Sequence, residues 1–226
     1  MNQPIVLVCG SKGGVGKSIT TMAVLDYLGT EHRYVRLQDA DSTNPDVWKS
    51  YSRSVESEVV PLDTVEGWIH LVNTCDASAF KTVVVNTPAR ANDSFRTHGR
   101  ILLDSLKELA RPLITLWVIN RQRDSLELLK QYLDFMPDQV VHVVRNGYFG
   151  EEHKYELFAQ SSLRETVLQA GGKDLFLPDL ADRVTDELYT RRITLAEAAA
   201  QLKLGDRVEL QRWRGRVKEM LVEAGV

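Results

Sequence analysis

The chain has 226 residues, a length that suits one sizeable domain. Hydrophobic residues make up 43% of the sequence and charged residues 26%, which excludes a disordered or collagen-like protein. The formal net charge of -3 provides no overall field that would draw the whole chain to nucleic acid or to a membrane. Two distant cysteines indicate neither a disulfide framework nor a zinc site, and no apolar run approaches the roughly 20 residues that span a bilayer. We therefore expect a cytoplasmic protein.

Short apolar runs alternate along the chain with longer amphipathic segments, which is typical of βαβ units. Strands are predicted at residues 5–9, 34–37, 82–85, 113–119 and 140–144, and helices at 17–29, 64–73, 94–110 and 125–135. From about residue 156 the chain is predicted to be mostly helical, with breaks at residues 171–172, Pro178 and Gly205. These elements predict an α/β fold in one domain over residues 1–226. Its sheet is expected to be doubly wound and mostly parallel, with a helical C-terminal part at about 156–226.

A glycine-rich segment, GSKGGVGKS at residues 10–18, follows the first predicted strand and opens a helix. Glycines without a Cβ let backbone N–H groups turn toward a polyphosphate, and the helix N-terminus adds its dipole. Lys17 is expected to reach the β and γ phosphates, and Ser18 to offer a hydroxyl to Mg²⁺. The predicted nucleotide-binding residues are Gly13, Gly14, Val15, Gly16, Lys17, Ser18 and Ile19.

The segment KGGVGKS at residues 12–18 resembles the deviant Walker A motif of the ParA/MinD family of ATPases. That family tolerates a residue such as Ser11 where the general P-loop pattern has its first glycine. The resemblance implies that Lys12 is a signature lysine, which crosses to the partner's phosphates in an ATP-sandwich dimer. It therefore implies ATP and Mg²⁺ as cofactors, catalytic roles for Lys12 and Lys17, and a homodimer that forms on ATP binding. The alternative for Lys12 is a solvated loop lysine.

Two carboxylates, Asp39 and Asp41, follow the second predicted strand, and ligands of open α/β sheets bind at the carboxyl ends of strands. The pair resembles the family's DxD switch I segment. By that resemblance, Asp41 is catalytic and orients or activates the attacking water, while Asp39 acts through the Mg²⁺ shell. A polar turn that caps the next helix is the alternative.

The third predicted strand ends in NTPA at residues 86–89, which resembles the family's Walker B and switch II sequence. Asn86 stands where the family has aspartate. An amide oxygen can still accept a hydrogen bond from Mg²⁺-bound water, but it carries no charge. We therefore expect ATP binding to persist and ATP hydrolysis to be weak. Arg90, Arg96 and Arg100 follow, and they are expected either to contact a partner or nucleic acid or to be solvated.

Asn146 follows the fifth predicted strand and resembles the family's base-reading position, where an amide pairs with N6 and N7 of adenine. An NKxD guanine signature is absent from the sequence, because the nearest stretch, NRQRD at residues 120–124, is one residue too long. ATP is therefore predicted rather than GTP. An ordinary turn asparagine is the alternative for Asn146.

Apolar residues recur at helical spacing from Asp206 onward, and in the MinD branch of the family a C-terminal amphipathic helix binds membrane. Residues 205–226 carry five basic and four acidic side chains, so the basic excess that draws a helix to anionic lipid is missing. We expect this helix to pack on the core or on a partner, and we do not expect membrane binding.

The short chain, the NTPA variant and the RNGYFG stretch at residues 145–150 most resemble the small ParA-like proteins of plasmids and conjugative elements, of the StbB, MobD and TraL type. That resemblance implies an ATPase switch in plasmid stability, partition or positioning, or conjugative transfer. It also implies a protein partner, either an adaptor or a DNA-binding protein, and non-specific DNA contact.

Two alternatives to a hydrolysing switch remain open. A nucleotide-gated binding module with little hydrolysis is favoured by Asn86. A metabolic P-loop ligase or kinase of the dethiobiotin-synthetase type is the other, and Lys12 argues against it because such enzymes need no crossing lysine.

Overall fold

The structure is a computed structural model that describes residues 2–10 and 12–226. A parallel sheet lies at its centre. Over these residues the sheet has seven strands in the order β3-β2-β4-β1-β5-β6-β7, and each neighbouring pair is parallel. The strands are β1 (Ile5–Cys9), β2 (Val35–Asp39), β3 (Glu56–Val59), β4 (Thr82–Asn86), β5 (Leu113–Ile119), β6 (Val141–Asn146) and β7 (Asp174–Leu177). The predicted doubly wound α/β fold is confirmed.

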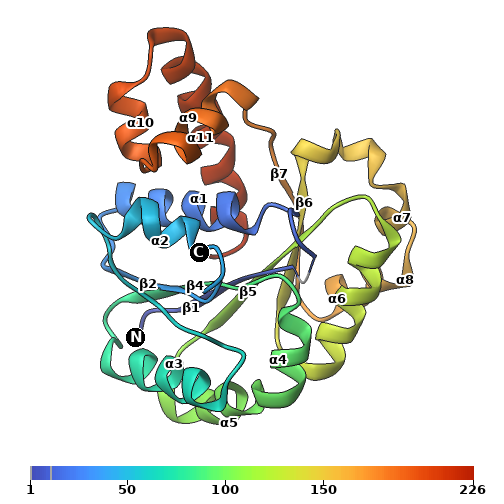
Figure 1. The fold of residues 1–226 in the computed structure, drawn as a ribbon. Helices are drawn as coiled ribbons and strands as arrows, with labels where there is room; N and C mark the ends of the chain where they lie inside the picture. Colours follow the sequence, from blue (N-terminus) through green and yellow to red (C-terminus); the bar gives the residue numbers. More distant parts are fainter. Residues whose placement is uncertain (1, 11) are drawn as a thin grey trace.

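Helices cover both faces of the sheet (Figure 1). One face carries α1 (Lys17–Thr30), α2 (Asp46–Tyr51), α9 (Asp182–Arg191), α10 (Leu195–Gln201) and α11 (Leu204–Glu223). The other face carries α3 (Val65–Ala77), α4 (Ala91–His98), α5 (Arg100–Leu109), α6 (Arg123–Phe135), α7 (Glu156–Ala159) and α8 (Ser162–Gln169). Because parallel strands are joined by such crossovers, all the strand carboxyl ends meet at one edge of the sheet.

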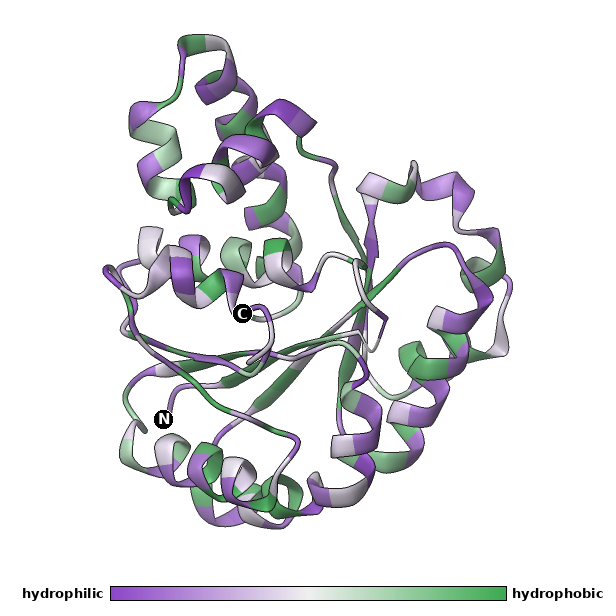
Figure 2. Ribbon diagram, in the orientation of Figure 1, coloured by the Kyte–Doolittle hydropathy of each residue, from purple (hydrophilic) through white to green (hydrophobic). Residues whose placement is uncertain are grey.

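The sheet separates two apolar cores. Successive side chains of a strand point to opposite faces, so Val6 and Val8 of β1 pack with α1 and α11, while Ile5 and Leu7 pack with α3 and α5. All four are completely buried. Figure 2 shows the hydrophobic stretches in the central strands and hydrophilic residues over the outer turns of the helices. This burial on both faces explains why β1 is a continuous apolar run.

The C-terminal helix α11 packs on α1, as expected for a helix without a basic excess. Its apolar face is buried, and two ion pairs join it to α1 and to Glu31, the residue that follows α1. Arg214 donates from Nε and Nη2 to the two carboxylate oxygens of Asp26 at 2.7 and 3.0 Å, and Lys218 pairs with Glu31 at 2.7 Å. Within residues 2–10 and 12–226, the structure contains no helix long and apolar enough to cross a bilayer.

The structure differs from the predicted elements at several places. Helix α2 and strands β3 and β7 are absent from the prediction, and the helix predicted at 94–110 is two helices, α4 and α5. They separate at Gly99, where an added Cβ would lie 2.5 Å from the carbonyl oxygen of Phe95. The break predicted at Gly205 lies instead at residues 202–203, between α10 and α11, and Gly205 itself is in the first turn of α11 with open space around it.

Candidate nucleotide-binding site

The loop between β1 and α1 has a backbone that requires glycine at several positions. Gly10, Gly14 and Gly16 have positive φ angles of 145°, 71° and 105°. An added Cβ would lie 2.6 Å from the carbonyl oxygen of Val118 at Gly10, and 2.2 Å from Nδ2 of Asn146 at Gly16. Glycine is thus required there for space as well as for backbone conformation. Gly13 and Gly14 are exposed, and Ser11 lies outside the described residues.

Lys17 begins α1 and is 7% exposed. Its Nζ donates to the carbonyl oxygen of Lys12 at 3.0 Å, so the ammonium lies against the glycine-rich loop. Burial lowers the pKa of Lys17 to about 8, although nearby Asp41 and Cys9 act in the opposite direction. The fold thus holds a largely desolvated cation beside a loop of backbone N–H donors, an arrangement that suits a polyphosphate.

Lys12 is neither free in solvent nor extended away from its own subunit. Its Nζ lies 3.1 Å from Oδ2 of Asp124 at the start of α6, and it also donates to Oε1 of Gln122. The Lys12 side chain is 29% exposed and that of Asp124 is 70% exposed. Within one chain, Lys12 is therefore paired with the first turn of α6 and with Gln122, the residue before that helix.

Asp39 and Asn86 meet across neighbouring strands, where both are buried. Asn86 Nδ2 donates to Asp39 Oδ1 at 2.9 Å, and Thr21 Oγ1 of α1 donates to Asn86 Oδ1 at 3.1 Å. Burial raises the pKa of Asp39, while hydrogen bonds from Asn86 and from backbone N–H groups lower it. The predicted Mg²⁺-shell pair is thus brought together and tied to the first turns of α1.

Asp39 and Asp41 have different surroundings. The backbone N–H groups of Asp41 and Trp48 donate to Asp39 at 3.2 and 2.9 Å, so Asp39 caps the start of α2. Asp41 is partly exposed and accepts a hydrogen bond from the backbone N–H of Asn44 at 3.1 Å. Asp39 is therefore the residue that caps the next helix. Asp41 keeps exposed carboxylate surface close to Lys17.

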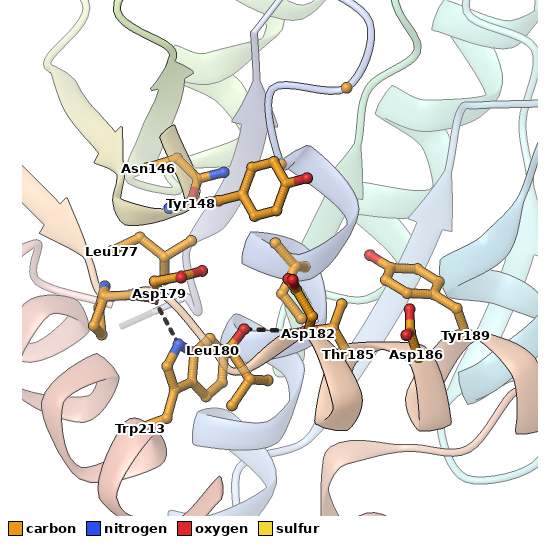
Figure 3. Close-up of a pocket in the computed structure, with 14 residues that line it drawn as sticks. Asn146, Tyr148, Leu177, Asp179, Leu180, Asp182, Thr185, Asp186, Tyr189 and Trp213 are labelled. Atoms are coloured by element: carbon orange, nitrogen blue, oxygen red, sulfur yellow. Dashed lines mark hydrogen bonds between the residues drawn. The ribbon is translucent and has the colours of Figure 1, made fainter. Parts of the chain in front are cut away.

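A cavity of about 520 Å³ continues from the loop past Asn146 (Figure 3). Asn146 Nδ2 donates to the carbonyl oxygen of Val15 at 2.8 Å, and its Oδ1 accepts from the backbone N–H of Tyr148 at 3.1 Å. Gly14, Gly16 and Ile19 line the near side of the cavity. The far side was not anticipated from the sequence, and it consists of Leu177, Pro178, Asp179, Leu180, Asp182, Thr185, Asp186, Tyr189 and Trp213.

The donor set fits Mg²⁺ held mainly by water and phosphate. Among the described residues, no group of three or more His, Cys, Asp or Glu side chains could hold a metal ion. Mg²⁺ usually retains several waters and takes one or two protein ligands together with substrate phosphates. Ser18, partly exposed in the first turn of α1, would contact it directly, with Asp39 and Asn86 acting through water.

A comparison with known proteins identifies the family. Protein MobD of Acidithiobacillus ferrooxidans is 51% identical over 221 residues, which cover 98% of this chain and 97% of the relative. The chain belongs to the MobD family. No protein-family model matches this MobD-family chain.

Solved structures agree with the fold of this MobD-family chain. MinD cell division protein of Aquifex aeolicus superposes with a TM-score of 0.58 at 14% identity, over 96% of this chain and 97% of MinD. Apo McdA from Cyanthece superposes with a TM-score of 0.52 at 16% identity, over 97% and 99% of the two chains. The chain therefore has the P-loop NTPase fold of MinD and ParA proteins, and the predicted ParA/MinD resemblance is confirmed.

Proposed function

We propose that this MobD-family chain binds ATP with Mg²⁺, dimerises when it does so, and acts as a weak ATPase switch in plasmid stability, partition or positioning, or conjugative transfer. The observation that carries the proposal is the loop between β1 and α1, whose glycines at positions 10 and 16 leave no room for a Cβ. Lys17 lies against this loop, and the cavity extends from it to Asn146. The protein is proposed to act in the cytoplasm.

The chemistry follows from where charges lie. The ammonium of Lys17 neutralises phosphate oxygens, and backbone N–H groups of residues 13–18 bind the rest. Asp41 accepts a hydrogen bond from the attacking water and orients it. Mg²⁺, when bound, neutralises further phosphate charge. Because Asn86 contributes no charge beside Asp39, turnover is expected to be well below the enzyme median of about 10 per second.

Dimerisation requires Lys12 to change partners. In the single chain its ammonium is bound to Asp124 and Gln122, so reaching the partner's phosphates replaces one exposed ion pair with contacts to a polyanion. A partner protein is also proposed, and MinD of Aquifex aeolicus is known in a complex with MinC.

Direct DNA contact has weaker support than a protein partner. Of the three arginines near switch II, Arg96 pairs with Asp93 at 3.0 Å and Arg100 approaches Asp104 at 3.8 Å. Exposed arginine charges bind phosphate groups without reading the bases, so any DNA contact through them is proposed to be non-specific, and these ion pairs weaken it.

The second candidate function is a nucleotide-gated binding module that barely hydrolyses ATP. The buried hydrogen bond between Asn86 and Asp39 favours it, because it fixes a neutral group where a charged one would support metal placement. Single-turnover hydrolysis separates the two functions. Loss of residual turnover in Asp41→Ala supports the ATPase, and no measurable turnover in the wild type supports the binding module.

Titration calorimetry with Mg²⁺ and either ATP or GTP tests nucleotide binding, with Lys17→Ala expected to abolish it. Light scattering tests assembly. ATP should shift the mass toward a dimer, and Lys12→Ala should block the shift while leaving nucleotide binding by the monomer intact. Tighter binding of GTP than ATP would contradict the adenine assignment, and a mass that does not respond to ATP would contradict the dimer.

A further inference from the structure

An exposed tyrosine lies at the mouth of the cavity. Tyr148 follows Asn146 by two residues, lines the same cavity and is 64% exposed. Figure 3 shows its ring beside the amide of Asn146, with Asp179 and Leu180 below both in the view. Lone exposed aromatic rings are common on protein surfaces, so exposure alone says little about Tyr148. Its position next to a predicted base-reading amide is what distinguishes it.

The backbone that carries Tyr148 is held firmly. Its N–H donates to Oδ1 of Asn146 at 3.1 Å. An added Cβ at Gly147 would lie 2.7 Å from the backbone nitrogen of Asp179, so this turn packs directly on the segment after β7. Tyr155 donates from its hydroxyl to the carbonyl oxygen of Asn146 at 2.5 Å. The ring therefore projects from an anchored turn and not from a loose loop.

The orientation of the ring is also supported. Phe149 meets Tyr148 edge to face, with ring centroids 5.2 Å apart and an interplanar angle of 87°. That geometry is favourable for aromatic pairs, and it uses the edge of one ring against the face of the other. With a solvent-exposed fraction of 64%, Tyr148 keeps ring surface for a further contact.

The other aromatic side chains that line the cavity are less suited to stacking on a base. Trp213 is 1% exposed, and its Nε1 donates to the carbonyl oxygen of Pro178 at 2.7 Å. Tyr189 lies on α9 at the end of the cavity beside Asp186, away from Asn146 in Figure 3. Among the described lining residues, Tyr148 thus combines exposed ring surface with a position beside Asn146.

We infer that the ring of Tyr148 stacks on the base of the bound nucleotide and sets much of the affinity for the nucleoside part. The inference rests on the proposed function, because it needs a nucleotide whose phosphates occupy the glycine-rich loop. Every base has a π-face, so stacking strengthens binding of all bases, whereas the Asn146 amide distinguishes their edges. Affinity and base selectivity are thereby divided between Tyr148 and Asn146.

Calorimetry with Mg²⁺ and three ligands, ATP, GTP and inorganic tripolyphosphate, tests the inference. Stacking on one aromatic ring corresponds to a loss of about 5- to 150-fold in affinity when that ring is removed. Tyr148→Ala should weaken ATP and GTP by a similar factor in this range and leave tripolyphosphate unchanged. Tyr148→Phe should bind ATP like the wild type. Asn146→Ala, in contrast, should change the ratio of ATP to GTP affinity.

Tyr34→Ala is the matched control, because Tyr34 is 72% exposed but lies directly before β2, at the opposite edge of the sheet from the loop. It should leave all three affinities unchanged. Photolabelling with 8-azido-ATP provides a spatial readout, and the label is expected on the peptide that contains Tyr148.

The outcomes separate the inference from the proposed function. If Tyr148→Ala binds ATP as tightly as the wild type, the stacking inference is overturned and nucleotide binding stands. Equal losses for ATP and tripolyphosphate also overturn it, because they show that the substitution disturbs the phosphate loop. If the wild type binds tripolyphosphate as tightly as ATP, no base contact exists. If it binds neither, the proposed function fails with the inference.

Discussion

Asn86 Nδ2 donates a hydrogen bond to Oδ1 of Asp39 across 2.9 Å, between adjacent strands of the sheet. Asp39 is completely buried and Asn86 is 1% exposed. The neutral amide therefore stabilises a carboxylate that burial would otherwise disfavour. Replacing the asparagine by aspartate would place two buried carboxylates in contact, so the protein without nucleotide gains stability from the uncharged residue.

The first prediction is that Asn86→Asp destabilises the nucleotide-free protein by about 1–3 kcal/mol at pH 7, because a buried hydrogen bond is replaced by repulsion. Repulsion raises the pKa of the carboxyl pair in the folded variant. The loss of stability should therefore disappear as the pH falls and one carboxyl is protonated. Chemical denaturation at pH 7 and pH 5 measures both effects.

The double substitution Asp39→Asn with Asn86→Asp is the control for the first prediction. It restores an amide–carboxylate contact with reversed polarity, and Thr21 can still donate to residue 86. The double variant should therefore recover part of the stability that Asn86→Asp loses. If Asn86→Asp is as stable as the wild type at pH 7, the side chains of Asp39 and residue 86 do not interact as described.

The second prediction concerns the pair of Lys12 and Asp124. Removing the charge in Asp124→Asn frees the Lys12 ammonium, so the dimer should form at lower ATP concentration. An exposed ion pair contributes at most about 1 kcal/mol, which limits the shift to about fivefold. Light scattering across an ATP titration measures it. Glu127→Gln is the control, because Glu127 pairs with Arg123 on the same helix and not with Lys12. A higher ATP requirement in Asp124→Asn would contradict the prediction.

The third prediction is that affinity for ATP falls as the pH rises through about 8, which is the lowered pKa of Lys17. The phosphates need the charged ammonium, and an ammonium with the ordinary pKa of 10.5 would stay charged over this range. Calorimetry at pH 7, 8 and 9 measures how the affinity for ATP changes with pH. Lys17→Arg is the comparison, because a guanidinium does not titrate here, and its residual affinity should not change over that range.

The contribution of Lys17 to stability should change with pH in the opposite direction to the affinity for ATP. Between the folded pKa of about 8 and the ordinary value of 10.5, the unfolded chain binds more protons than the folded chain. The contribution of Lys17 to the free energy of unfolding therefore rises with pH over this window. Denaturation of wild type and Lys17→Met at pH 8 and pH 10 isolates this contribution.

The fourth prediction concerns the ion pair that joins α11 to α1. Arg214→Met leaves Asp26 buried without its partner, which should cost about 3–5 kcal/mol because a buried charge remains unpaired. The pKa of Asp26 is already raised by burial, with Arg214 opposing that rise, so it should rise further in the variant. The deficit should therefore shrink at acidic pH, which denaturation at pH 7 and pH 5 can show.

Two further variants test whether the cost comes from the unpaired charge. Asp26→Asn with Arg214→Met removes both charges and should be more stable than Arg214→Met alone. Lys218→Met breaks a pair whose side chains are 56% and 36% exposed, so it should cost no more than about 1 kcal/mol. Equal losses in Arg214→Met and Lys218→Met would contradict the prediction.

The central strands could be predicted from sequence because burial on both faces makes them apolar runs. The predicted bounds of β1 and β5 agree with the structure at both ends. Strand β3 could not be found in this way, because it lies at the edge of the sheet and carries two glutamates. Glu56 is neutralised by Arg36 and Lys81, which come from other segments of the chain.

The phosphate loop and the strand-end residues could be predicted because their spacing reflects local geometry. Their partners could not, since these depend on tertiary contacts. Lys12 and Asp124 are 112 residues apart, and Asn146 meets Val15 across 131 residues. The far wall of the cavity was missed because it follows β7, a four-residue strand that periodicity does not reveal.

The attachment of α11 to α1 affects how deletion experiments should be read. Trp213 holds the carbonyl of Pro178 at the wall of the cavity, and the apolar side chains around it cover α1. Removing the chain after residue 203 would expose to water Ala23 and Tyr27 of α1, which line one cavity with Trp213 and Val217 of α11, and would release the segment that follows β7. A C-terminally truncated protein that fails to capture a partner would therefore report misfolding. Point substitutions at the exposed residues Leu204 and Val208 can instead locate a docking surface on α11 while leaving its buried face intact.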